Sequence, residues 1–311
     1  MNKISIVGAG MTGATTAHWL AERELADLVL VDVVEGMPQG KGLDMLEAMP
    51  IIGKDVRISG ANDYAATKDS DIIIITAGLP RKPGMSRDDL LSANAEIVGT
   101  AATETLKHAP DAIYIVLTNP LDTMAYLTMK KTGLPRERVI GQAGILDSAR
   151  MRAFVAMETG VSVENIDCYV LGGHGDEMVP LTRHSNIAGI SLKEYLPAEK
   201  LEAIVARTRK GGGEIVNLLK TGSAFYAPSA ACAQMAEAIL KNKHLIVPCA
   251  AYMDGEYGLN DMFFGVPVML GRTGMERIIE YKLDDDEKTM FDKSAAAVKE
   301  THEALKKLVA L

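Results

Sequence analysis

A single histidine of this sequence stands among glycines, in the segment Gly172-Gly173-His174-Gly175-Asp176. Small neighbours leave room for a ligand beside the imidazole. A neutral histidine near its ordinary pKa can take a proton from an alcohol and return it to a carbonyl. The other five histidines lie in helix-like or mixed segments, where solvated or core positions explain them. His174 is therefore the candidate general base.

Two charged residues, Asp147 and Arg150, lie three positions apart in a segment that reads as the start of a helix. Residues at this spacing share one helix face. From the residues alone, Asp147 is an N-cap and the two side chains form a surface ion pair. The acid nearest to His174 in the chain is Asp176, which makes it the natural group to orient the imidazole.

Two loops carry further polar groups. Segment 78–87 places three positive charges, Arg81 and Arg87 among them, between glycines and prolines. A hinged segment of this kind can close over an anion and expel water, although a solvated basic turn has the same pattern. Asn119, in Thr118-Asn119-Pro120, can donate and accept at once, which suits a site that holds both a hydroxyl and a carbonyl. Alone, the Asn-Pro pair is also an ordinary turn signal.

The start of the chain combines a glycine fingerprint with an acid. An apolar run over residues 3–7 leads into Gly8-Ala9-Gly10-Met11-Thr12-Gly13, and a second apolar run ends in Asp32, about 20 residues further on. Gly8 allows a tight turn, Gly10 admits a pyrophosphate, and Gly13 lets helix pack closely on strand. The helix N-terminus would bind the phosphates, and Asp32 a ribose 2′-hydroxyl. The pattern predicts a dinucleotide site; the alternative for Asp32 is a solvated acid at a strand end.

These groups need a scaffold that brings several loops together. Apolar runs alternate with amphipathic stretches up to residue 142, and the four isoleucines of Ile72–Ile75 suit a strand buried on both faces. This alternation predicts an α/β fold with a doubly wound parallel sheet, in which ligands bind beyond the carboxyl ends of the strands. The predicted strands are Ile4–Val7, Leu28–Val31, Val56–Ser59, Ile72–Ile75, Ile113–Leu117 and Val139–Gln142.

The second half of the chain has a different pattern. Short apolar runs between glycine-bearing turns predict antiparallel strands within 244–281. Gly211-Gly212-Gly213 should weaken or bend a helix over Leu201–Lys220. We therefore predict a dinucleotide-binding domain over 1–144 and an α+β substrate domain over 145–311. The remaining predicted elements are a strand over Ile166–Leu171, helices over Ile145–Thr159 and Ala224–Lys241, and a last helix from Asp284 to Lys307 that packs through Phe291, Val298, Leu305 and Leu308.

Composition excludes several classes of function. The formal net charge is −8 and no basic cluster dominates, so nucleic acid and anionic membranes are poor partners. No secretory signal and no run of about 18 apolar residues is visible, so no membrane span is expected. Three cysteines, Cys168, Cys232 and Cys249, lie in apolar neighbourhoods without metal-site spacing. They predict buried free thiols in a reducing cytoplasm, with neither disulfides nor a metal site.

Together these motifs resemble the lactate/malate dehydrogenase family over essentially the whole chain, and more narrowly its lactate-dehydrogenase-like malate branch. The resemblance implies a Rossmann-type sheet that binds NAD, and reversible NAD-dependent oxidation of (S)-malate to oxaloacetate. The motifs that carry it are Gly8-x-Gly10-x-x-Gly13 with Asp32, Arg81-Lys82-Pro83-Gly84-Met85-x-Arg87, Thr118-Asn119-Pro120, Leu146-Asp147-x-x-Arg150 and Gly173-His174-Gly175-Asp176.

The resemblance also implies a role for each polar candidate. His174 takes the hydroxyl proton, and Asp147, rather than Asp176, orients the imidazole and stabilises its protonated form. Arg150 grips the α-carboxylate of the substrate in a bidentate fork, and Arg87 polarises the reacting carbonyl.

Further contacts follow from the same resemblance. Asn119 touches both substrate and cofactor, and its bond to Pro120, cis in relatives, is left open here. Ser223 falls near a small polar position on the substrate wall. The cofactor contacts that the resemblance implies are Gly8, Ala9, Gly10, Met11, Thr12, Gly13, Asp32, Asn94, Leu117, Thr118 and Asn119.

Arg81 decides the substrate within this family. Lactate-specific relatives have glutamine at this loop position, and malate enzymes have arginine. Over pyruvate the guanidinium would face a methyl group unpaired, which costs about 3–5 kcal/mol. A charge-assisted bond to a second carboxylate gains about 1.5–3 kcal/mol instead. Malate and oxaloacetate are therefore favoured over lactate and pyruvate. Asp32 would repel a 2′-phosphate, which favours NAD over NADP.

Two other functions stay open. One is a lactate dehydrogenase or another 2-hydroxy-acid dehydrogenase. The other is a non-catalytic NAD-binding sensor, which would require a broken set of His, Asp and Arg. Gly173 stands where lactate enzymes have an acid, and Gly175-Asp176 departs from the mitochondrial-type malate enzymes. The resemblance further implies a homo-oligomer, with a tetramer favoured over a dimer.

Overall fold

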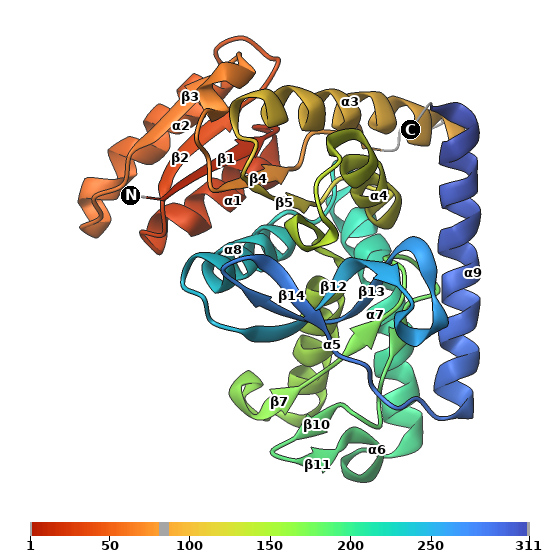
Figure 1. Cartoon of the computed structure of the whole chain (residues 1–311). Coiled ribbons are helices and arrows are strands. Elements are labelled where there is room, and N and C mark those ends of the chain that lie inside the picture. The colour runs from red at the N-terminus through yellow and green to blue at the C-terminus, as the bar shows by residue number, and fades with distance from the viewer. Residues whose placement is uncertain (1, 81–86, 310–311) are drawn as a thin grey trace.

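The computed structural model describes residues 2–80 and 87–309, and Figure 1 shows the chain as a ribbon. Its largest sheet has nine strands in the order β14-β13-β12-β6-β5-β4-β1-β2-β3. Six neighbouring strands of this sheet run parallel, in the order β6-β5-β4-β1-β2-β3. This arrangement confirms the predicted doubly wound sheet. The strands of this sheet are β1 Lys3–Val7, β2 Asp27–Val31, β3 Ile58–Ala61, β4 Ile72–Ile75, β5 Ile113–Val116, β6 Val139–Gly141, β12 Leu245–Asp254, β13 Asn260–Gly271 and β14 Gly274–Ile278.

Helices and two small sheets complete the described part of the chain. The α-helices are α1 Met11–Glu22, α2 Met37–Ala48, α3 Arg87–His108, α4 Leu121–Thr132, α5 Ala143–Thr159, α6 Leu192–Tyr195, α7 Ala198–Leu219, α8 Tyr226–Leu240 and α9 Asp285–Leu308. The small sheets are β11-β10-β7 and β8-β9, built from β7 Ile166–Asp167, β8 Val170–Leu171, β9 Val179–Pro180, β10 Asn186–Ile187 and β11 Ile190–Ser191.

The isoleucine run explains why the parallel sheet is covered on both faces. All four side chains of β4 are fully buried. Successive side chains of a strand point to opposite faces. Ile72 and Ile74 accordingly enter one apolar core, and Ile73 and Ile75 enter another. Each face of the sheet is therefore sealed by helices, and only the strand ends and their loops are left for ligands.

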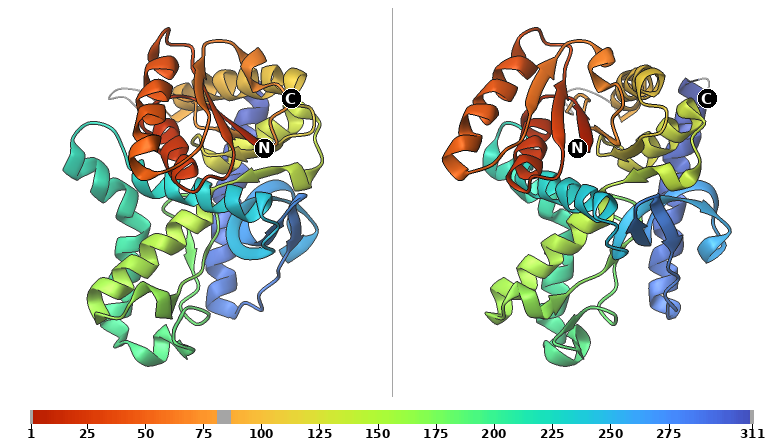
Figure 2. Two further views of the ribbon diagram at one scale, coloured as in Figure 1. Left: turned by 90° about the vertical axis from the view of Figure 1, so that its left-hand side faces the viewer. Right: turned by 60° about the vertical axis from the view of Figure 1, so that its left-hand side comes forward.

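The predicted antiparallel strands of the second half are confirmed, and they extend the same sheet. β12, β13 and β14 form an antiparallel meander, and Ala250 of β12 pairs with Gly141 of β6. In both views of Figure 2 the red to yellow segment lies at the top and much of the green and teal segment lies below it, while the blue α9 spans both levels. The sheet thus continues from one half into the other.

Several predicted boundaries are wrong. The third strand begins at Ile58, not Val56. The strand predicted over Ile166–Leu171 is two short strands, because β7 pairs with β10 whereas β8 pairs with β9. Between them, the Tyr169 N–H donates to Ser185 Oγ at 3.1 Å instead of to a neighbouring strand.

The last helix begins as its acidic start predicts. Asp284 caps α9 in a reciprocal capping box with Glu287. Phe291, Val298 and Leu305 are buried, which confirms that this helix packs on the body, whereas Leu308 is 46% exposed and does not contribute as predicted. Figure 1 shows α9 running along one side of the molecule up to α3.

Two features bear on the class of protein. Cys168, Cys232 and Cys249 are buried free thiols, as predicted. Among the helices of the described residues, none is both long and apolar enough to cross a bilayer.

Candidate active site

The glycine fingerprint forms the turn from β1 into α1. Gly8 has a φ of +103°, which side chains disfavour, and an added Cβ would lie 2.6 Å from the Ala77 nitrogen. A Cβ on Gly13 would lie 1.8 Å from the Gly8 carbonyl oxygen. On Gly10 an added Cβ meets no described atom within 4 Å. Gly8 and Gly13 are therefore required by packing, and Gly10 leaves open space at the helix N-terminus.

This turn fits a dinucleotide. Gly10 is the N-cap of α1, and no side chain of the described residues caps the first turn, so its N–H groups are available to an anion. Asp32 lies at the end of β2, where its carboxylate accepts the Ala9 N–H at 2.7 Å and the Val34 N–H at 3.0 Å. Its carboxylate thus stands beside the glycine turn, where the sequence places a ribose ligand.

Sequence reasoning missed a lysine at this turn. Lys41, on α2, donates from Nζ to the Ala9 carbonyl oxygen at 2.7 Å. The Ala9 residue is therefore held by Asp32 at its N–H and by Lys41 at its carbonyl. The signal in the sequence was a single basic residue in a helix, which is ordinarily a solvated position.

The loops after β4 and β5 are tied together by Asn94 of α3. Its Oδ1 accepts the Leu79 N–H at 2.7 Å, and its Nδ2 donates to the Asn119 carbonyl oxygen at 2.8 Å. Thr118 is buried and donates to the Ala77 carbonyl oxygen at 2.7 Å. The Asn119–Pro120 bond is cis, which the sequence had left open. Asn119 itself is exposed at the carboxyl edge of the sheet, next to the partly buried Leu117.

The structure brings His174, Asp147 and Arg150 into one hydrogen-bonded chain. His174 Nδ1 lies 2.8 Å from Asp147 Oδ2, and Arg150 Nη1 lies 3.0 Å from Asp147 Oδ1. The side chains of Asp147, Arg150 and His174 are 2%, 12% and 16% exposed. The prediction of a surface ion pair, made from the residues alone, is therefore wrong. The prediction that Asp147 is an N-cap is also wrong, because Asp147 lies inside α5 and the N-cap of that helix is Gln142.

The tautomer and the charge of His174 follow from this chain. A carboxylate only accepts hydrogen bonds, so Nδ1–H donates to Asp147 and Nε2 is the basic nitrogen. Burial lowers the pKa of His174, but the charge and the hydrogen bond of Asp147 outweigh burial, so that pKa lies above its ordinary value. The site can therefore hold an imidazolium after proton transfer.

Two of the three consecutive glycines of α7, Gly211 and Gly212, lie against Arg150. The helix is continuous over Ala198–Leu219, so the three glycines do not interrupt it. An added Cβ on Gly211 would lie 3.1 Å from Arg150 Cδ, and one on Gly212 would lie 3.6 Å from its Nη2. Arg150 Nε is buried without a hydrogen-bond partner among the described residues. The guanidinium is thus packed against the face of α7 that Gly211 and Gly212 form.

Other predicted residues lie apart from this chain or outside the described residues. Asp176 is exposed and lines a different cavity of about 350 Å³ with Arg209 and Lys293, so Asp147 alone takes the orienting position. Ser223 is exposed in the loop between α7 and α8. Arg81 and the side chain of Arg87 fall outside the described residues.

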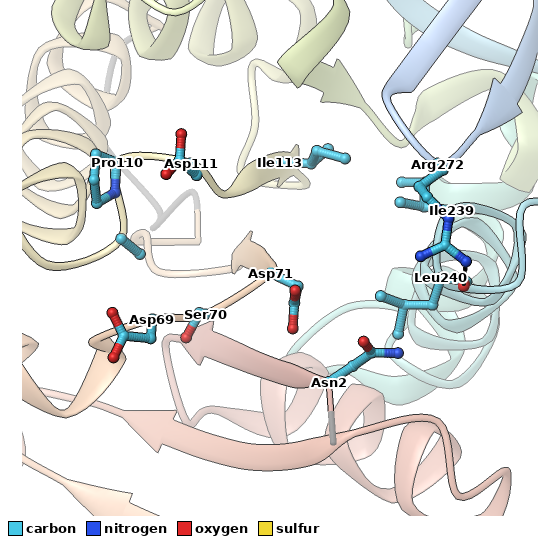
Figure 3. Close-up of a pocket in the computed structure, with 11 residues that line it drawn as sticks. Asn2, Asp69, Ser70, Asp71, Pro110, Asp111, Ile113, Ile239, Leu240 and Arg272 are labelled. Atoms are coloured by element: carbon cyan, nitrogen blue, oxygen red, sulfur yellow. Dashed lines mark hydrogen bonds between the residues drawn. The ribbon is translucent and has the colours of Figure 1, made fainter.

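A second cavity, of about 390 Å³, lies at the opposite edge of the sheet. Figure 3 shows its lining residues, among them Asn2, Asp71 and Ile113 at the amino ends of β1, β4 and β5. Parallel sheets bind their ligands beyond the carboxyl ends, where the glycine turn, Asn119 and the loops above lie. This cavity is therefore separate from the candidate active site.

Comparisons with known proteins agree with this geometry. Residues 2–141 match the family model for the lactate/malate dehydrogenase NAD-binding domain, and residues 145–309 match that for the α/β C-terminal domain. The chain is 58% identical to a malate dehydrogenase of Roseiflexus castenholzii, over 98% of this chain and 99% of that one.

Solved structures of both substrate classes share the fold. The malate dehydrogenase of Cryptosporidium parvum superposes with a TM-score of 0.96 at 45% identity, over 98% of this chain and 99% of that one. The lactate dehydrogenase of the same organism, complexed with lactic acid and NAD, gives a TM-score of 0.95 at 39% identity, over 98% of each chain. The fold therefore does not separate malate from lactate. The NAD-binding turn, the buried His–Asp–Arg chain and the matches over both halves establish that this chain belongs to the lactate/malate dehydrogenase family.

Proposed function

We propose that the chain is an NAD-dependent malate dehydrogenase that interconverts (S)-malate and oxaloacetate. The observation that carries the proposal is the buried chain Arg150–Asp147–His174, with its 3.0 and 2.8 Å contacts. It pairs an anion-binding guanidinium with a general base, as oxidation of a 2-hydroxy acid requires. Relatives that are 57–59% identical to this chain are named malate dehydrogenase, which supports malate as the substrate.

The residues of the chain divide the work as follows. NAD⁺, when bound at the glycine turn, supplies a hydride acceptor. His174 takes the hydroxyl proton on Nε2, because its Nδ1 is committed to Asp147. Asp147 then stabilises the imidazolium, as a buried carboxylate does beside a catalytic histidine. Arg150 binds the α-carboxylate through guanidinium donors that Asp147 does not occupy, because Asp147 accepts from Nη1.

The remaining site assignments rest on the sequence motifs. Arg81 binds the second carboxylate, and Arg87 stabilises the negative charge that develops on the reacting oxygen. Asn119 contacts the substrate from the loop after β5, and Asn94 fixes that loop through its bond to the Asn119 carbonyl oxygen. Gly8 to Gly13, Asp32, Leu117 and Thr118 contact the cofactor.

The test compares oxaloacetate with pyruvate under identical conditions, each reduced with NADH. We expect kcat/KM for oxaloacetate to exceed that for pyruvate by roughly 100-fold or more, because an unpaired guanidinium costs about 3–5 kcal/mol. Arg81→Gln should collapse this preference, and Lys82→Gln, the matched loss of one neighbouring charge, should keep it. A preference for pyruvate would indicate a lactate dehydrogenase. Tight NADH binding without turnover of either oxo acid would indicate a sensor.

We also propose a division of labour along the chain. Residues 1–144 bind the cofactor, and residues 145–311 supply Asp147, Arg150 and His174.

The protein works as a homo-oligomer in the cytoplasm, with a tetramer favoured over a dimer. Leu43 and Leu46, both exposed on α2, support an association surface, and the buried free thiols suit a reducing compartment. Light scattering on the purified chain tests the assembly: a monomer would contradict it.

A further inference from the structure

The loop that carries His174 has little stiffness of its own. It connects the two-residue strands β8 and β9, and Gly172, Gly173 and Gly175 flank the histidine. Glycines leave the backbone many conformations. The Asp147 contact holds the ring, so other contacts must hold the backbone.

Neighbouring elements bind three successive N–H groups of this loop. The Gly172 N–H donates to the Gly265 carbonyl oxygen of β13 at 2.8 Å, and the Gly173 N–H to Ser294 Oγ of α9 at 3.0 Å. The His174 N–H donates to Asp122 Oδ2 at 2.9 Å. Of the three acceptors, only Asp122 is ionisable.

Asp122 occupies an unfavourable position for a purely structural acid. It is buried at the start of α4, and its Oδ1 has no hydrogen-bond partner among the described residues and no access to solvent. A buried carboxyl with half of its oxygens unpaired costs stability relative to a neutral residue of the same shape. Packing alone therefore does not account for an acid here.

The charge of Asp122 acts on the same imidazole. The ionisable groups that face His174 are Asp147 and Arg150 from α5 and Asp122 from α4; α9 and β13 present the hydroxyl of Ser294 and a backbone carbonyl. Burial and Arg150 lower the pKa of His174, whereas Asp147 and, to a smaller extent, Asp122 raise it. Burial raises the pKa of Asp122 itself to about 6, so its charge is present at neutral pH and above.

We propose that Asp122 is a positioning residue of the reaction, which fixes the His174 backbone to the start of α4 and so holds the imidazole in register with Asn119. Asn119 lies three residues before Asp122, across the cis bond to Pro120. One short segment therefore carries both Asn119 and Asp122, the residue that anchors His174 of the other half. The proposal rests on the proposed function, because it assigns His174 as the base.

Two substitutions in the full-length protein separate the hydrogen bond from the charge. Asp122→Asn keeps an oxygen that accepts the His174 N–H and removes the negative charge. We expect kcat within about fivefold of the unsubstituted protein, and a fall of about half a unit to one unit in the apparent pKa of kcat/KM for malate oxidation, because the imidazolium loses a stabilising charge. Asp122→Ala also removes the acceptor, and we expect kcat to fall roughly 10- to 100-fold with the Kd for NADH unchanged.

The control is Asp111→Asn, the same chemical change at an exposed carboxyl on the opposite edge of the sheet. It should leave kcat and the pH profile unchanged. Wild-type kcat and pH profiles in both Asp122 variants would overturn the proposal. So would a loss of NADH affinity in step with kcat, since that indicates general misfolding.

A second readout does not depend on turnover. The His174 imidazole can be titrated by NMR in the unliganded protein, and Asp122→Asn should lower its pKa while Asp111→Asn does not. If the protein reduces neither oxaloacetate nor pyruvate, the proposed function fails, and the NMR titration still decides whether Asp122 acts on His174. An unchanged imidazole pKa in Asp122→Asn would refute that action.

Discussion

The three glycines of α7 offer a test that separates helix propensity from contact with Arg150. Each substitution by alanine adds the same methyl group to the same helix. At Gly211 that methyl would lie 3.1 Å from Arg150 Cδ, and at Gly212 it would lie 3.6 Å from Nη2. At Gly213 it would meet no described atom within 4 Å. The steric effect therefore falls from a tight contact to none over three neighbouring positions.

The expected magnitudes follow from these contacts. Alanine is favoured over glycine in a helix interior by about 0.8–1 kcal/mol. Gly213→Ala should gain all of this, which raises the melting temperature of a chain of this length by roughly 1–2 °C. At Gly211 part of the gain is lost, because Arg150 or α7 must move by a few tenths of an ångström to relieve the contact. Displacement of the guanidinium should raise KM for oxaloacetate roughly 3- to 30-fold.

The assay pairs steady-state reduction of oxaloacetate with scanning calorimetry of the same preparations. We expect Gly213→Ala to be more stable at unchanged kcat/KM, and Gly211→Ala to gain less stability and lose kcat/KM through KM. Gly212→Ala should fall between them. An unaltered KM in Gly211→Ala together with the full gain in stability would refute the link between these glycines and Arg150. Equal losses of activity at Gly211 and Gly213 would refute it as well.

Three further outcomes are expected. His174→Asn should lower kcat by on the order of 10²- to 10⁴-fold with the Kd for NADH kept, as measured by rapid kinetics and fluorescence; near-normal turnover would remove His174 from the mechanism. Lys41→Met should weaken NADH binding roughly 3- to 30-fold in a fluorescence titration, because the Ala9 carbonyl loses its charged donor; equal affinity would show that the turn holds without it. The hydrogen bond from Lys243 lowers the pKa of Glu237 to about 2, although burial opposes this shift. The stability that the Glu237 carboxylate adds to the folded protein is therefore fully present above pH 4.5, its ordinary pKa, and is lost as the pH falls toward 2. Glu237→Gln should reduce stability to urea at pH 7 and flatten the decline across that acidic window; parallel pH curves would contradict this.

The sequence predicted the parts of the fold that have local signatures. The isoleucines of β4 and the glycine turn before α1 depend on burial and close approach, which a short segment encodes directly. The pairing of strands β12 and β6 involves one residue pair, Ala250 and Gly141, and these residues lie far apart in the chain. Edge pairing of this kind has no pattern within either strand, so the sequence predicted antiparallel strands without predicting their sheet.

The candidate site shows the same limit at single residues. From the residues alone, Asp147 is an N-cap in a surface pair, because its spacing to Arg150 is that of many exposed ion pairs. In the structure, α5 begins at Ala143, and Asp147 is turned inward to His174. The family motif placed Asp147 beside His174 correctly, since a motif carries tertiary context that spacing lacks. Lys41 had neither signal and was missed.

The histidine loop explains why the site needs both halves of the chain. A hairpin of two-residue strands with three glycines cannot fix an imidazole by its own packing. α5 therefore holds the ring, and β13, α9 and α4 hold the backbone. Because Asp122 lies in α4, within the nucleotide half, a shift of that half would move the anchor of His174 with it. The proposed proton acceptor is thus held by elements of its own half and by one anchor, Asp122, from the half that carries the glycine turn.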